Sequence, residues 1–164
     1  MLKRTILILL FICFKPDIGF AQKPQLLLFW SEACPVCIFY GVEIRKLQAN
    51  YGETVDWTFV FPNLTSTDST AQAYLLKNKL TGNIVVADAA DWVKKYAVEV
   101  TPEVVLLGTE GELLYAGRID NSYEKIGRRR HKATETELSD RLQKLADNQP
   151  FVYIRTRAVG CFLH

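Results

Sequence analysis

The chain has 164 residues, of which 49% are hydrophobic and 23% charged, and its formal net charge is +2. This length fits one domain, and a nearly balanced charge favours no nucleic-acid partner. A small scaffold held together by disulfides would carry more than the four cysteines present.

The N-terminal segment has the pattern of a secretory signal peptide. Two basic residues precede an apolar run over 6–14, and small residues lie just before Gln22. The run is too short for a permanent membrane-spanning helix, so we expect no stable span after its removal. The sequence therefore predicts a signal peptide at 1–21, a domain over 22–164, and a location in the periplasm or outside the cell.

Two cysteines follow the first predicted strand. The strand-type apolar run over 25–30 is followed by Cys34 and Cys37, and helical apolar spacing then continues to about Asn50. Cys34 should therefore lie in the first turn of a helix, where unpaired N–H groups and the helix dipole stabilise a thiolate. Cys37 lies about one turn further in, within reach to close a disulfide on Cys34. This arrangement suits thiol–disulfide exchange.

The rest of the chain alternates between strand and helix patterns. Residues 55–61 form a second strand, which completes a βαβ unit with two parallel strands. The further expected elements, in chain order, are a helix around 71–76 capped by Asp68 or Ser69, a short strand over 84–87, a helix through 92–96 capped by Asp88 or Asp91, a strand over 103–108, its hairpin partner over 113–119, a polar basic loop over 121–132, an amphipathic helix over 134–146 with a capping-box-like start, and an edge strand over 151–156 in a C-terminal extension from about 148.

Cys161 is a third cysteine outside the signal peptide, and the sequence leaves three interpretations of it open. It is a buried inert thiol, a partner for an intermolecular disulfide that makes a dimer, or a third redox thiol reached by Cys34. Nothing in the local sequence places the tail relative to the CxxC motif.

The basic run over 128–132 has the composition of an anion-binding patch. Acidic residues such as Glu124 and Glu135 flank it, so a solvated loop is the better interpretation. His131 and His164 are too few to argue for a metal site, and we predict neither a metal nor a cofactor.

Two motifs, taken together, resemble the thioredoxin-like superfamily. They are Phe29-Trp30-(x)3-Cys34-Pro35-Val36-Cys37 and Tyr96-(x)4-Thr101-Pro102-(x)5-Gly108-(x)2-Gly111. Their order is most similar to the extracytoplasmic thiol–disulfide interchange and redoxin (AhpC/TSA-like) branch, over about 25–146. The resemblance implies an α/β thioredoxin-like fold with a central mixed β-sheet flanked by helices. It also implies a helix–strand insert between the CxxC helix and the Thr-Pro strand.

The same resemblance implies roles for individual residues. Cys34 would be the nucleophile and Cys37 the resolving thiol. The Thr101–Pro102 bond would be cis and face the cysteines, and Thr101 would offer its backbone to an extended substrate; a trans proline opening an edge strand is the alternative. The remaining residues expected to contact substrate are Pro35, Val36 and Trp30, for which a place in the core or at its rim is the alternative.

Thioredoxins carry a buried acid six residues before the nucleophile, where this chain has Leu28. Glu32 is a candidate replacement that would take the proton of Cys37. A solvated loop carboxylate without such a role is the alternative interpretation.

The predicted function is that of a thiol–disulfide oxidoreductase of the cell envelope, acting on protein thiols and disulfides with an unidentified redox partner. One alternative is a Cu(I)-handling, metallochaperone-like protein on the same fold, because two soft thiolates suit that ion. Another is a non-enzymatic binding module in which the cysteine pair is a permanent structural disulfide.

Overall fold

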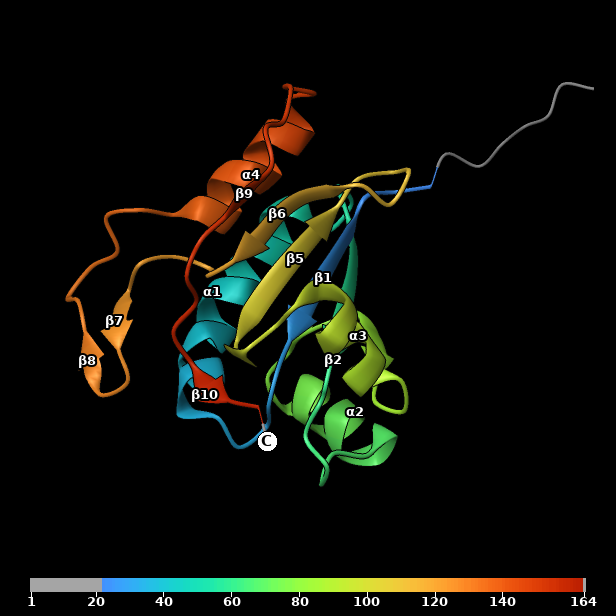
Figure 1. The fold of residues 1–164 in the computed structure, drawn as a ribbon, viewed down its shortest axis with the longest axis vertical. Coiled ribbons are helices and arrows are strands. Elements are labelled where there is room, and N and C mark those ends of the chain that lie inside the picture. The colour runs from blue at the N-terminus through green and yellow to red at the C-terminus, as the bar shows by residue number, and fades with distance from the viewer. Residues whose placement is uncertain (1–21, 164) are drawn as a thin grey trace, which may run out of the picture.

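The computed structural model describes residues 22–163 (Figure 1), so the predicted signal peptide lies outside the described residues. A six-stranded mixed sheet forms the centre, in the order β3-β2-β1-β5-β6-β9. Its strands are β1 (Gln25–Phe29), β2 (Asp56–Val60), β3 (Asn83–Val85), β5 (Glu103–Leu107), β6 (Leu113–Gly117) and β9 (Ile154–Arg155). β1 pairs parallel with β2 and antiparallel with β5, which confirms the predicted βαβ unit and the mixed sheet.

Helices cover both faces of this sheet. α1 (Pro35–Tyr51), α2 (Asp68–Lys77) and α4 (Glu137–Ala146) contribute to one hydrophobic core, and α3 (Ala89–Tyr96) packs against the other. In Figure 1 α1 passes behind the sheet, while α3 lies in front of it.

β1 explains why both faces are covered. Leu26 and Leu28 point into the core under α1, whereas Leu27 and Phe29 point into the core under α3, and all four side chains are fully buried. Successive side chains of a strand alternate between faces, so a continuous apolar run requires packing on both sides. The apolar run that the sequence shows is therefore the signature of a central strand.

The start of α1 matches the sequence-based expectation. The helix begins at Pro35, and Cys34 is its N-cap residue in an extended conformation. Proline suits the first helical position because it has no N–H to leave unpaired. The Ile38 N–H donates to the Cys34 carbonyl at 3.0 Å, which closes the first turn behind the cysteine.

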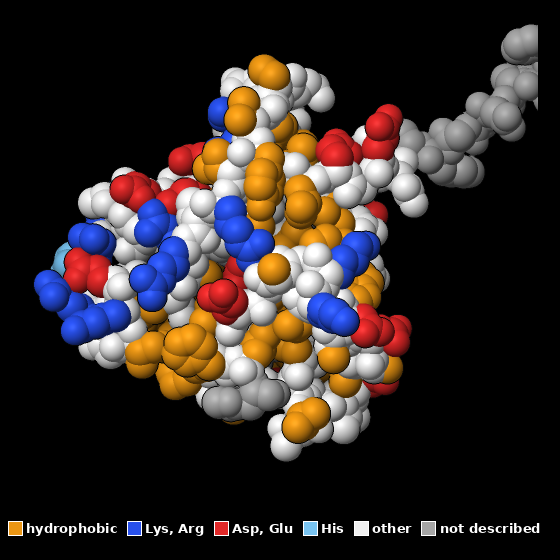
Figure 2. Space-filling model, in the orientation of Figure 1, with side chains coloured by type: hydrophobic (Ala, Val, Ile, Leu, Met, Phe, Trp, Pro, Cys, Tyr) orange, Lys and Arg blue, Asp and Glu red, His pale blue; other side chains and the backbone are white. Residues whose placement is uncertain are grey.

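A hairpin replaces the predicted polar loop after β6. Its strands are β7 (Tyr123–Lys125) and β8 (Arg128–Arg129). Glu124 pairs with Arg128 at 2.6 Å, and the Arg129 guanidinium lies 4.6 Å from the ring centroid of Phe39. Ionic and cation–π contacts stabilise the hairpin, whereas alternating apolar residues do so in an ordinary strand. The sequence of the hairpin therefore lacks the usual strand pattern. Figure 2 shows the basic side chains gathered over it.

Two helix starts differ from the predicted ones. α2 is capped by Thr67, whose side chain and that of Thr70 form a reciprocal capping box. α4 begins later than predicted because the Thr134 N–H donates to the side chain of Asn121 at 2.8 Å, outside the helix. The residues that suggested a capping box are held by the preceding loop.

The chain after α4 returns across the sheet to the start of α1. It includes β9, shorter than the predicted edge strand over 151–156, and ends in β10 (Cys161–Phe162), which pairs antiparallel with β4 (Val100–Thr101). Figure 1 shows this segment descending from β9 to β10, beside the N-terminal end of α1. The sequence did not predict β4 or β10.

β2, α2, β3 and α3 lie between α1 and β4. That part of this stretch is an insertion relative to thioredoxin stays a prediction. Within 22–163, no helix combines the length and the apolar character that crossing a membrane requires.

Candidate active site

Cys34 and the Thr101–Pro102 bond meet where α1 begins beside β4. The Sγ atom of Cys34 lies 3.2 Å from the carbonyl oxygen of Thr101, across a sequence separation of 67 residues. The Thr101–Pro102 peptide bond is cis. The two motifs on which the resemblance rests therefore form one site.

Cys37 lies in the first turn of α1 and is fully buried, and Cys34 itself is only 2% exposed. Burial raises the pKa of the Cys37 thiol well above its ordinary value, and the nearby Glu32 carboxylate adds to the rise. Hydrogen bonds from the Ser31 backbone and the Thr101 side chain act in the opposite direction. Thr101 thus has a carbonyl next to the Cys34 sulfur and a side chain that lowers the pKa of Cys37, a double role that the sequence did not indicate.

The disulfide at this site joins Cys34 to Cys161, with the two Cα atoms 6.1 Å apart. Cys37 is the free cysteine within 22–163, so the expected Cys34–Cys37 disulfide is not the pairing present. The reason is the β10–β4 ladder, which sets Cys161 opposite Thr101 and hence next to Cys34.

This pairing decides one of the three interpretations of Cys161. An inert thiol is wrong, because the sulfur is bonded within the chain and the residue is partly exposed. A redox role for Cys161 and a disulfide dimer through it stay predictions.

Trp30 belongs to the core rather than to a surface that a substrate contacts. Its side chain is fully buried, its ring meets that of Phe59 edge-on at 5.8 Å, and its Nε1–H donates to the Tyr74 hydroxyl at 3.1 Å. Of the other residues expected to bind substrate, Pro35 is exposed beside Cys34 and Val36 is largely buried. Their contact with substrate stays a prediction.

The Glu32 carboxylate is held by the start of α2. The Ser66 hydroxyl donates to it at 2.8 Å and the Thr70 hydroxyl at 3.1 Å. Leu28, in the position of the thioredoxin acid, is fully buried in the core. The proton-shuttle role of Glu32 stays a prediction.

Among residues 22–163, no group of three or more His, Cys, Asp or Glu side chains is placed to hold a metal ion. His131 is exposed in the loop before α4, and His164 lies outside the described residues.

Comparison with known proteins shows the fold rather than a close relative. No protein-family model matches the sequence, and no curated protein matches it. An uncharacterized conserved protein from Geobacillus kaustophilus is similar in structure, with 15% identity, a TM-score of 0.73, and coverage of 86% of this chain and 76% of that one. A hypothetical protein from Sinorhizobium meliloti has 18% identity and a TM-score of 0.72, and the match covers 87% of this chain and 79% of that one.

The chain has a thioredoxin-like fold. Among the similar structures is a secreted disulfide oxidoreductase of Mycobacterium tuberculosis described as homologous to Escherichia coli DsbE. It shares 20% identity with a TM-score of 0.51, and the match covers 75% of this chain and 83% of that one.

Proposed function

We propose that this protein is a thiol–disulfide oxidoreductase that exchanges disulfides with protein thiols through Cys34 and Cys37. The observation that carries the proposal is the position of Cys34, at the N-cap of α1 with its Sγ 3.2 Å from the carbonyl of Thr101. The fold shared with a secreted disulfide oxidoreductase supports it. Together with the sequence pattern of a signal peptide, that likeness favours work outside the cytoplasm.

Cys34 is the nucleophile in this proposal. α1 has 17 residues and no acidic side chain in its own first turn, so no carboxylate of the helix offsets the positive end of its dipole at the sulfur. A cysteine in such a setting has a pKa of roughly 3.5–7.5, against about 8.5 for a free thiol. The thiolate attacks one sulfur of a substrate disulfide, and the electron pair of the broken S–S bond leaves on the other sulfur, which then takes a proton.

Cys37 is the resolving thiol. Its thiolate attacks the Cys34 sulfur of the mixed disulfide, forms the Cys34–Cys37 disulfide and expels the substrate as a thiolate. Burial raises the pKa of Cys37 and opposes its deprotonation, while the hydrogen bonds from Ser31 and Thr101 stabilise the anion. The raised pKa of Cys37 therefore keeps its thiolate scarce at neutral pH, which slows resolution.

The edge of β4 is the proposed substrate site. Pro102 has no N–H, so Thr101 is the last residue of this short strand that offers both backbone groups to an extended chain. Strand addition at such an edge supplies hydrogen bonds that do not depend on the substrate's sequence. The proposed substrate is thus an extended polypeptide with a cysteine or disulfide. Pro35 and Val36 are the predicted flanking contacts, and the exchange needs no cofactor.

The acidity of Cys34 is tested in the double variant Cys37→Ala and Cys161→Ala, which keeps Cys34 as the reactive cysteine. Alkylation by iodoacetamide between pH 4 and 10 should follow a midpoint below about 7.5, whereas an ordinary thiol gives about 8.5. A midpoint at the ordinary value would remove the chemical basis of the proposal.

Catalysis is tested by insulin reduction with dithiothreitol. Cys34→Ser should reduce the rate to the uncatalysed background, and Cys37→Ser should accumulate a mixed disulfide with insulin. A native disulfide with a potential below about −300 mV, together with no acceleration by the wild type, would instead identify a binding module with a structural disulfide.

A further inference from the structure

We propose that the C-terminal segment 157–163 is a tethered substrate: it fills the polypeptide site along β4, and its disulfide to Cys34 keeps that site closed until Cys37 displaces it. This inference rests on the proposed function and names how the same site is regulated. The segment has the features expected of a bound substrate strand, namely antiparallel pairing, a cysteine at the nucleophile and a backbone that meets Thr101.

The pairing places the tail in the substrate position. Cys161 lies opposite Thr101 and Phe162 opposite Val100, and the Leu163 N–H donates to the Glu99 carbonyl at 3.3 Å. Leu163 also packs against the core under α3. Because β4 has only two residues, this short ladder uses its whole edge. An external polypeptide can therefore pair with β4 only after the tail leaves.

Gly160 makes this close fit achievable. It is buried, and a Cβ atom built on it would overlap the carbonyl group of Thr101. Any side chain at this position would push the tail away from β4 without touching the CxxC motif.

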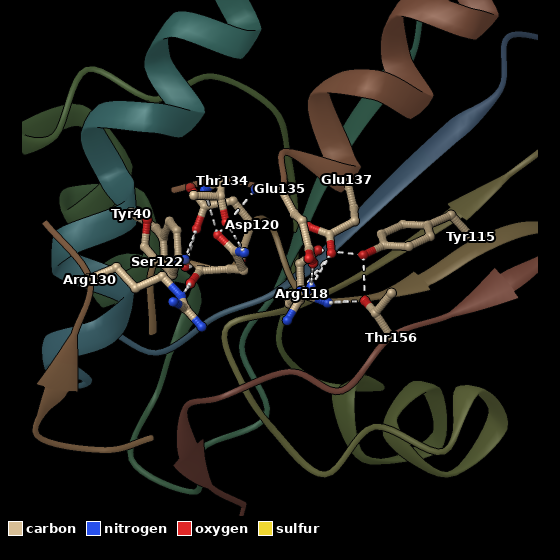
Figure 3. A network of polar contacts seen from close by, with 11 residues as sticks. Tyr40, Tyr115, Arg118, Asp120, Ser122, Arg130, Thr134, Glu135, Glu137 and Thr156 are labelled. Atoms are coloured by element: carbon tan, nitrogen blue, oxygen red, sulfur yellow. Dashed lines mark hydrogen bonds and ion pairs between the residues drawn. The ribbon is translucent and has the colours of Figure 1, made fainter. Parts of the chain in front are cut away.

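The tail is anchored immediately before it reaches the site. The Thr156 N–H donates to the Ala116 carbonyl at 3.0 Å, and its hydroxyl lies 2.7 Å from the Tyr115 hydroxyl and 3.2 Å from the Arg118 N–H. Figure 3 shows Thr156 joined to Tyr115 and Arg118, and Arg118 to the glutamates at the start of α4. Only residues 157–160 separate this anchor from Cys161.

Arg155 forms a second anchor. Its guanidinium donates to the Tyr96 and Ala97 carbonyls at 3.0 and 2.6 Å, and it pairs with the buried Glu103 at 2.6 Å. Glu103 directly follows Pro102 as the first residue of β5, so this anchor lies two residues from Thr101. A tether this short holds its end at an effective concentration in the millimolar range, which outcompetes a micromolar substrate about 100-fold or more.

The tail is exposed on its outer side. An open groove of about 1020 Å³ runs along it, lined by tail residues, by β4 and by the β7–β8 hairpin. Phe162 is 71% exposed. Phe162 therefore loses little contact when the tail leaves, whereas Cys161 and Leu163 each pack against a core cluster that their departure would uncover.

The opening step is an internal exchange. The Cys37 thiolate attacks the Cys34 sulfur, the Cys34–Cys37 bond forms and the Cys34–Cys161 bond breaks. The electron pair leaves on Cys161, which takes a proton from water. No external oxidant or reductant is needed, because the protein holds one disulfide before and after.

The first test is a disulfide map of the oxidised protein. Free thiols are alkylated in the native state and after unfolding, and the bridged peptides are identified by mass spectrometry. The wild type should contain the Cys34–Cys161 disulfide, with Cys37 alkylated only after unfolding. Gly160→Val should contain Cys34–Cys37 with a free Cys161. Gly41→Ala is the matched control, because a Cβ there meets nothing within 4 Å, and it should map as the wild type does.

The second test measures access to Cys34. A synthetic unstructured peptide with one cysteine is mixed with each oxidised protein, and mixed disulfides are counted over time. Gly160→Val and Cys161→Ser should react at least about tenfold faster than the wild type and Gly41→Ala. A wild type that maps as Cys34–Cys37, or that reacts as fast as the two opened variants, would overturn the tethered-substrate proposal. If no variant reacts at all, the oxidoreductase proposal fails, and the map alone decides whether the tail occupies the site.

Discussion

The two disulfides available to Cys34 should stabilise the fold by very different amounts. The Cys34–Cys161 disulfide closes a loop over a sequence separation of 127, whereas a Cys34–Cys37 disulfide would close a loop of one helical turn. The chain-entropy relation gives about 5 kcal/mol for the long loop and about 2 kcal/mol for a four-residue loop at 25 °C. Oxidation should therefore contribute about 3 kcal/mol more when the tail cysteine is the partner.

Two alanine variants isolate these contributions. Cys37→Ala can form only the long loop at Cys34, and Cys161→Ala only the short one. Each variant is unfolded with urea, oxidised and reduced, and the fluorescence of the buried Trp30 and Trp57 reports the transition. Comparing each variant with its own reduced form cancels the effect of the substitution itself on the free energy of unfolding.

The oxidised-minus-reduced difference in the free energy of unfolding should be larger for Cys37→Ala. An equal or larger difference for Cys161→Ala would contradict the pairing that the structure shows. It would mean that the tail does not hold Cys161 against Cys34 in the folded protein.

Three further predictions follow from single side chains. Conversion of the Cys34–Cys161 disulfide to Cys34–Cys37 should accelerate about tenfold per pH unit from pH 7 to 9, because burial raises the pKa of Cys37 and keeps its thiolate scarce. Disulfide maps of acid-quenched samples measure the rate of conversion. A rate that stops rising near pH 8.5 would be contrary evidence. Arg155→Ala should lower the free energy of unfolding by about 2–3 kcal/mol in urea titrations, because it leaves the buried Glu103 without its cation; an unchanged midpoint would oppose this. Glu32→Gln should make the conversion faster at pH 7, because the Glu32 carboxylate contributes to the raised pKa of the Cys37 thiol. A slower conversion would instead assign Glu32 the proton role.

The parts of the fold that the sequence predicted are those specified by local signals. The apolar run of β1 and the proline after Cys34 mark a strand and a helix start without reference to the rest of the chain. The meeting of Cys34 with Thr101 is not local, and only the resemblance to thioredoxin-like proteins implied it.

The tail could not be predicted in this way. β10 has two residues, too few for any periodic pattern, and its partner strand lies about 60 positions earlier. The signal that could have found it is Gly160 next to Cys161, because glycine before a cysteine permits a close backbone approach. The sequence also could not decide whether Trp30 is buried or faces a substrate. It ends the apolar run over 25–30, and a buried aromatic and a surface aromatic give the same pattern at that position.

The tail also makes substrate binding and disulfide isomerisation parts of one equilibrium. A polypeptide that pairs with β4 does so only in the molecules whose tail is displaced, so it binds the Cys34–Cys37 isomer more tightly than the Cys34–Cys161 isomer. Linkage requires that the substrate shift the isomer ratio by the same factor by which isomerisation shifts the substrate's affinity.

Saturating oxidised protein with a non-reactive peptide in which serine replaces the cysteine should therefore raise the fraction of Cys34–Cys37 disulfide, with no change in the total number of disulfides. The Cys161→Ser protein, which has only one isomer at Cys34, should bind the same peptide more tightly than the wild type. A peptide that binds both proteins equally would show that the tail and the substrate use different surfaces.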